Sequence, residues 1–301
     1  MLRFPDNSRV CFIGDSLTHN NTYLSYIIDT YNKNFKNSNI RFFNCGTSGG
    51  TAEFALSVFE EDVMLCKPTH AVITLGVNDS GRWLLADERT VERYETLNER
   101  FETYKKSVEL LCNRIANKGI NLILCTPPPY DEYTEGGDVP FKGGFALMAE
   151  YANFIRNFAS KNNIPLCDYH TALTKTLQTD RLYGDDRIHL LPHGYFVMSK
   201  YFLENQGISI GEEYPLPDYF SEWAGLIRIY RDIFAAECMI IDPNASTTEE
   251  KIQYAKEFIA TRNDWFAELA TAYISNKPHQ KELFNKLSEV YENRIFNKGC
   301  N

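Results

Sequence analysis

The 301-residue chain lacks any apolar run long enough to cross a membrane, and it contains neither a C-x-x-C pair nor a cluster of lysine and arginine. Its formal net charge is -9. Because nucleic-acid binding draws most of its affinity from clustered basic side chains, we expect no nucleic-acid partner. Because no apolar run is long enough to cross a bilayer, we expect no membrane partner. The first apolar run is also too short for a signal peptide, which predicts a cytoplasmic location.

Cysteine is present but shows no pattern of pairing. The eight cysteines are widely spaced, and several lie inside apolar runs, such as L-I-L-C at 122–125. This placement is typical of small buried side chains in a reducing compartment. It argues against a disulfide framework and against a zinc finger.

Short apolar runs alternate with longer charged segments of helical spacing. The runs at 9–13, 40–44, 71–75, 122–125 and 164–167 predict buried strands, and 23–31, 52–64, 90–116 and 145–159 predict helices. This alternation predicts an α/β fold in which helices cover both faces of a parallel sheet. The polar residues that follow each strand should then meet at one edge of the sheet.

The pattern changes near Gly211, after which no further strand is predicted. The sequence therefore indicates a main domain over 1–210 and a helical extension over 211–301. Ser246 and Glu249 form a capping box that opens an amphipathic helix in this extension. We expect the extension to pack on its own domain or on a partner, which includes a second copy of the chain.

A serine follows the first predicted strand, in F-I-G-D-S-L-T at 12–18. A serine at a strand-to-helix turn presents its hydroxyl above the sheet, where backbone N–H groups of the next turn face the same point. Ser16 is therefore a candidate nucleophile. If the tripeptide G-D-S is taken alone, the alternative interpretation is that Ser16 simply caps a helix.

A base for this serine is available in D-R-I-H at 186–189. The Asp186 carboxylate can hold one imidazole N–H of His189, which leaves the other ring nitrogen to accept the serine proton. Donors for an oxyanion are also present. The Ser16 N–H, the Gly46 N–H and the Asn78 side-chain amide follow predicted strands and predict a three-donor oxyanion hole.

Four sequence blocks, in order, make the chain similar to the SGNH or GDSL-type esterases and lipases. These blocks are F-I-G-D-S-L-T, N-C-G-T-S-G-G-T, G-V-N-D and D-R-I-H-L. The resemblance covers roughly 9–205 and implies a three-layer α/β/α fold with a flavodoxin-like five-stranded parallel sheet. It implies that Ser16, Asp186 and His189 are catalytic and that Gly46 and Asn78 belong to the oxyanion hole. The reaction that these residues would perform requires no metal or organic cofactor.

Three competing functions are weaker. Asp186, His189 and His193 resemble a metal cluster, but Pro192 starts a helix after His189, so the two histidines do not share a helical face. The dinucleotide motif G-x-G-x-x-G is absent after the first two strands. A non-catalytic binding module on the same fold is expected to lack one of the four blocks, and none is missing.

The substrate is predicted to be a small polar ester, an O-acetyl group on a carbohydrate. The long loop at 127–144 contains Tyr130, Tyr133 and Phe141, whose rings either stack on a sugar or pack within the loop. Asp15, beside the candidate nucleophile, either contacts substrate or shapes the turn. A lipase, an acyl-thioesterase and a non-catalytic carbohydrate-binding protein remain alternatives, because a fold does not select among these functions.

Overall fold

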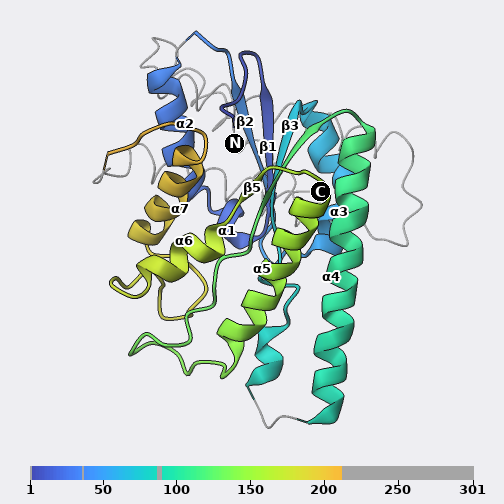
Figure 1. The fold of residues 1–301 in the computed structure, drawn as a ribbon, viewed down its shortest axis with the longest axis vertical. Coiled ribbons are helices and arrows are strands. Elements are labelled where there is room, and N and C mark those ends of the chain that lie inside the picture. The colour runs from blue at the N-terminus through green and yellow to red at the C-terminus, as the bar shows by residue number, and fades with distance from the viewer. Residues whose placement is uncertain (1, 36, 87–89, 212–301) are drawn as a thin grey trace, which may run out of the picture.

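The computed structural model describes residues 2–35, 37–86 and 90–211 (Figure 1). The predicted helical extension therefore lies outside the described residues, except for residue 211. None of the helices in the described part is long and apolar enough to cross a membrane.

A five-stranded parallel sheet forms the centre of the fold, with strand order β2-β1-β3-β4-β5. Its strands are β1 (Arg9–Gly14), β2 (Arg41–Gly46), β3 (His70–Thr74), β4 (Asn121–Cys125) and β5 (Leu166–Cys167). In the register of β1 with its two neighbours, Gly14 lies beside Gly46 of β2 and Thr74 of β3. The loops that follow these strands therefore start from one edge, and the predicted α/β class and flavodoxin-like sheet are confirmed.

Helices cover both faces of this sheet and make three layers (Figure 1). One face carries α2 (Thr22–Asn34), α6 (Tyr169–Thr176) and α7 (Pro192–Glu204); the other carries α3 (Ala52–Ser57), α4 (Val91–Asn117) and α5 (Gly144–Lys161). Side chains alternate along a strand, so β1 sends Val10 and Phe12 into the first core and Cys11 and Ile13 into the second. Both faces of the sheet are thus buried, as continuous apolar runs predict.

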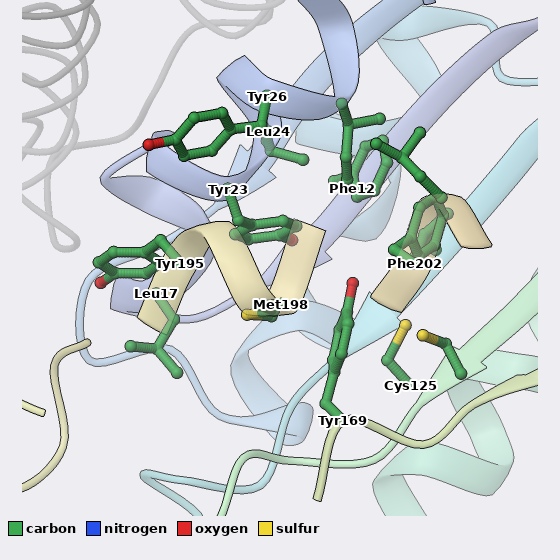
Figure 2. Packing of buried hydrophobic residues seen from close by; sticks show 14 of the residues in the cluster. Phe12, Leu17, Tyr23, Leu24, Tyr26, Cys125, Tyr169, Tyr195, Met198 and Phe202 are labelled. Atoms are coloured by element: carbon green, nitrogen blue, oxygen red, sulfur yellow. The ribbon is translucent and has the colours of Figure 1, made fainter. Parts of the chain in front are cut away.

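Aromatic side chains fill the core beneath α2 and α7 (Figure 2). The ring of Phe12 lies 6.1 Å from that of Tyr23 and 5.7 Å from that of Phe202, measured between centroids. The Tyr23 hydroxyl shares a hydrogen bond of 3.0 Å with Thr18 Oγ1 in the short helix α1 (Ser16–His19). A fully buried side chain therefore anchors the helix that begins at Ser16.

One predicted helix is divided in the structure. The predicted helix 52–64 ends as α3 at Ser57 and continues as a π-helical turn, η1 (Phe59–Val63), and a 3-10 turn, η2 (Met64–Cys66). Ala52, Ala55, Phe59 and Val63 are all buried at helical spacing, which explains the prediction of one helix. The hydrogen-bonding pattern changes along the segment while the buried face continues.

Candidate active site

The turn after β1 places Ser16 at the edge of the sheet. Asp15 is the N-cap of α1, and its Oδ1 accepts a hydrogen bond of 3.0 Å from the Leu17 N–H. Ser16 is the first residue of this helix. Among the described residues, the Ser16 N–H has no acceptor, so it remains able to donate to a ligand at this edge.

Two glycines allow α1 to lie close to the strand ends. A Cβ at Gly14 would lie 2.1 Å from Thr18 Oγ1, and one at Gly46 would lie 2.5 Å from the His19 backbone nitrogen. The Gly46 N–H donates to Asn44 Oδ1 at 3.0 Å, and Asn44 Nδ2 donates to the Thr18 carbonyl at 2.8 Å. This contradicts the prediction that Gly46 supplies an oxyanion donor, because its N–H already orients Asn44.

The structure brings the three predicted catalytic side chains into one hydrogen-bonded chain. His189 Nε2 lies 2.8 Å from Ser16 Oγ, and His189 Nδ1 lies 2.5 Å from Asp186 Oδ2. Ser16 and His189 are 173 residues apart in the sequence. This geometry allows His189 to accept the serine proton while Asp186 holds the second N–H of its ring.

Asp186 is fixed by backbone as well as by the imidazole. Its Oδ1 accepts from the Ile188 N–H at 3.0 Å and from the His189 N–H at 2.9 Å. Burial acts to raise the pKa of Asp186, but the hydrogen bonds from His189 and from these two amides outweigh it, so the pKa lies below its ordinary value. Asp186 therefore stays ionised, and its Oδ2 can accept the second N–H of the His189 ring.

Two further donors belong to neighbouring loops. Asn78 Nδ2 donates one hydrogen to the Gly50 carbonyl at 3.1 Å, which leaves its second hydrogen for a ligand. Gly49 precedes that carbonyl in the loop after β2; it is exposed and has a left-handed φ of 73°. In the described part of the chain its N–H meets no acceptor. The free amide of this loop is thus that of Gly49, three residues after the predicted Gly46.

A buried carboxyl group joins these two loops. Asp79 Oδ1 accepts a hydrogen bond of 2.8 Å from the Ala52 N–H, at the start of α3. Its Oδ2 has no partner among the described residues. Burial raises the pKa of Asp79 to about 7, and the Asp15 carboxylate adds to the increase. Sequence reasoning missed this residue, because an aspartate after Asn78 resembles an ordinary turn former.

Asp15, for which the sequence leaves open a contact with substrate or a role in shaping the turn, lies beneath the turn after β1. Its side chain is buried, and it is bonded to the turn that it caps. Burial raises its pKa to about 6, although the Leu17 N–H and the charges of His189 and Arg82 act in the opposite direction. The structure therefore favours the turn-shaping interpretation.

Arg187, which lies between the two predicted catalytic residues, is the second residue that sequence reasoning missed. Its side chain is buried, and its backbone has a left-handed φ of 63°. The guanidinium donates to four backbone carbonyls of the loop after β4, those of Asp131, Thr134, Gly136 and Asp138. Arg187 thus fastens this loop to the segment that carries Asp186 and His189.

The aromatic residues of this loop have different surroundings. Tyr130 is buried, its hydroxyl accepts from the Phe141 N–H at 3.0 Å, and its ring stacks on that of Phe141. Both rings therefore contribute to packing of the loop, and a sugar cannot stack on the face of Tyr130 that Phe141 covers. Tyr133 is 73% exposed and remains a candidate substrate contact.

Metal ligation finds little support at this site. Both ring nitrogens of His189 are engaged, and His193 is exposed on the first turn of α7. In the described ranges, the group compact enough to hold a metal consists of Cys11, Cys45 and Cys66. These thiols lie in the second apolar core, where burial raises the pKa of Cys11 well above its ordinary value. The neutral thiol is thereby favoured, whereas metal binding needs the thiolate.

Comparisons with known proteins agree with this geometry. A model described as the GDSL-like lipase/acylhydrolase family matches residues 12–196. A curated relative, an acetylxylan esterase of Geobacillus stearothermophilus, is 26% identical over 226 residues, which are 68% of this chain and 97% of that protein.

Solved structures share the fold. A catalytic mutant of an acetylxylan esterase from the same organism gives a TM-score of 0.59 at 21% identity, and the match covers 71% of this chain and 100% of that one. A gut microbial diltiazem-metabolizing enzyme gives a TM-score of 0.63 at 28% identity. That match covers 69% of this chain and 48% of the other, so this chain spans about half the length of that protein.

Replacement of Arg187 by lysine tests its role in fastening the loop. We expect Arg187→Lys to lower the free energy of unfolding by about 2 kcal/mol, because a single ammonium cannot reach four carbonyls and leaves some of these buried and partly buried acceptors without their donor. Arg181→Lys, which alters the exposed ion pair with Asp185, is the matched control and should change the free energy of unfolding by less than about 0.5 kcal/mol. Equal effects of the two variants in urea unfolding would contradict the assignment.

The raised pKa of Asp79 predicts a pH-dependent stability. Because the folded-state pKa lies near 7 and that of the unfolded chain near ~3.9, the native state binds this proton more tightly. Its stabilising contribution is complete below about pH 4 and is lost as the pH rises through about 7. Relative to Asp79→Asn, the wild type should therefore lose at most about 4 kcal/mol of stability over this window.

Chemical denaturation at pH 5 and at pH 8 covers about two of the three pH units of this window, so the loss measured between these two values should be at most about 3 kcal/mol. Asp6→Asn, at an exposed carboxylate, provides the control and should track the wild type at both values. A stability difference between wild type and Asp79→Asn that is the same at pH 5 and pH 8 would show that Asp79 does not titrate in this range.

Proposed function

Because the chain belongs to the GDSL-like lipase/acylhydrolase family and is a carboxylic ester hydrolase, we propose that it is a serine esterase that removes O-acetyl groups from carbohydrates through an acyl-enzyme. The observation that carries the mechanism is the unbroken chain from Ser16 Oγ through His189 to Asp186. In this arrangement the residues need no metal and no organic cofactor to perform the reaction.

In the first half of the reaction, Ser16 Oγ attacks the ester carbonyl while His189 Nε2 takes its proton. The carbonyl oxygen becomes an oxyanion, which receives hydrogen bonds from the Ser16 N–H and the Asn78 amide, with the Gly49 N–H as the third donor. His189 then protonates the leaving alcohol. The acyl group stays on Ser16 Oγ, and the sugar hydroxyl departs.

In the second half, water replaces the alcohol. His189 Nε2 removes a proton from this water as it attacks the acyl carbonyl, and the same three donors hold the second oxyanion. Collapse of this intermediate returns the proton to Ser16 Oγ and releases the carboxylic acid. Throughout, Asp186 keeps the imidazole in one orientation and stabilises its positive form.

The choice of a carbohydrate acetate rests on the openness of the site and on the curated relative. The side chains of His189 and Asp186 are 46% and 44% exposed, so a bulky alcohol part can approach them. The curated relative is named an acetylxylan esterase. An exposed triad suits a small acyl group carried on a large polar molecule better than it suits a long acyl chain, which needs a buried apolar channel.

Hydrolysis of p-nitrophenyl acetate, butyrate and octanoate tests this function. The wild type should prefer acetate, and Ser16→Ala should lower kcat by at least about 10⁴-fold, because the nucleophile is lost. Ser57→Ala, an exposed serine at the end of α3, is the matched control and should keep full activity.

Each result of this assay bears on a different part of the proposal. A preference for octanoate would favour the lipase alternative. A folded wild type that is inert on every ester would favour a non-catalytic carbohydrate-binding protein. Full activity of Ser16→Ala would exclude the serine mechanism.

A further inference from the structure

We propose that a cavity beside the loop after β4 is a subsite for a neutral sugar residue of the substrate's carbohydrate chain; this inference rests on the proposed function. The cavity, called the loop cavity here, measures about 340 Å³ and lies between this loop, the start of α5 and the carboxyl end of α6. Its volume falls at the lower end of the range of small-molecule sites, roughly 300 to 1,000 Å³. It lies apart from the triad, so it would bind a part of the substrate that does not react.

Aromatic and aliphatic side chains line part of the loop cavity. Tyr133 and Phe145 line it with ring centroids 5.5 Å apart, and Leu177 also belongs to the lining. Tyr133 is 73% exposed, although aromatic rings generally gain free energy from burial. The C–H face of a pyranose ring can cover an exposed aromatic ring of this kind, which favours a sugar as the ligand.

Polar groups also line the loop cavity. Asp131, Thr134 and Gln178 line the loop cavity and offer donors and acceptors for sugar hydroxyls. The lining includes no lysine or arginine, and its one charged side chain is the Asp131 carboxylate. A uronic acid or a phosphorylated sugar would find no counter-ion there, so the site is suited to a neutral sugar.

Two buried polar atoms on α6 lack partners next to this cavity. Thr174 lines it, and Thr174 Oγ1 has no hydrogen bond within the described residues. One helical turn earlier, His170 Nε2 is likewise unpaired, and the His170 ring lies 5.6 Å from that of Phe145. An unpaired buried polar group costs free energy. A sugar hydroxyl, or a water held beneath the sugar, would supply the missing partner.

The loop cavity is held at a fixed position relative to the triad. Arg187 donates to the carbonyls of Asp131 and Thr134, two residues that line the cavity. The Asp131 N–H donates in turn to the Arg187 carbonyl at 3.2 Å. Because Arg187 lies between Asp186 and His189, one buried side chain connects the sugar subsite to the catalytic segment. A carbohydrate chain bound in the loop cavity would thus be oriented relative to Ser16.

Kinetics on two acetate esters tests the subsite. The substrates are acetylated xylotetraose, whose sugar chain can reach the loop cavity, and p-nitrophenyl acetate, which has no sugar. We expect Tyr133→Ala to lower the ratio of kcat/KM for acetylated xylotetraose to kcat/KM for p-nitrophenyl acetate about tenfold. The change should come mainly from a higher KM for acetylated xylotetraose. Tyr94→Ala, another exposed tyrosine, on α4 across the sheet, is the matched control and should leave the ratio unchanged.

Binding of deacetylated oligosaccharides to Ser16→Ala by calorimetry provides a second readout that is independent of turnover. Xylotetraose should bind, tetragalacturonate should not, and the added change Tyr133→Ala should weaken xylotetraose binding about tenfold. An unchanged ratio and unchanged binding in Tyr133→Ala would overturn the subsite. Wild-type activity on p-nitrophenyl acetate without activity on any acetylated sugar would instead overturn the proposed function, and xylotetraose binding would still decide the subsite.

Discussion

The active site depends on the close contact of a four-residue helix with the ends of two strands. Helix α1 approaches β1 and β2 so closely that only hydrogen atoms fit where side chains of Gly14 and Gly46 would stand. Asn44 bonds the carboxyl end of this helix, and Tyr23 holds it from the core. Because Ser16 is the first residue of α1, each of these contacts fixes the position of its hydroxyl and its amide.

Buried groups extend this rigidity to the other parts of the site. Asp79 connects the loop that carries Asn78 to the start of α3, and Arg187 connects the segment of His189 to the loop after β4. The side chains of His189 and Asp186, by contrast, are nearly half exposed. The site thus combines an open surface, which a large substrate needs, with donors that are ordered before the substrate binds, which oxyanion stabilisation needs.

Sequence patterns predicted the elements that have strong periodicity and the side chains that have specific chemistry. The four longer strands and the grouping of Ser16 with His189 follow from apolar runs and from motif order. Patterns could not distinguish Gly46 from Gly49, because both are glycines and only the folded chain shows whose N–H is already bonded. Arg187 resembled a spacer within D-R-I-H, since its four carbonyl partners lie about fifty residues earlier in the sequence.

Shorter elements carry weaker signals. Strand β5 has only two residues, at the end of the predicted run 164–167, and α6 has eight, so neither spans enough of the sequence for a clear period to emerge. Yet α6 contributes Thr174 to the loop cavity, and Leu177, which caps the end of this helix, contributes as well. Residues that would select the substrate therefore lie where sequence periodicity is least informative, while the residues that would perform the reaction lie in the recognisable motifs.

The central claim is that the ester's acyl group passes through Ser16. Rapid acid quenching of the enzyme during turnover of p-nitrophenyl acetate, followed by mass spectrometry of its peptides, tests this claim directly. The account predicts one acetyl group on the peptide that contains Ser16, located on that serine by fragmentation, which disappears when the substrate is exhausted. Steady turnover without any acetylated Ser16, or with the acetyl group on another residue, would contradict it.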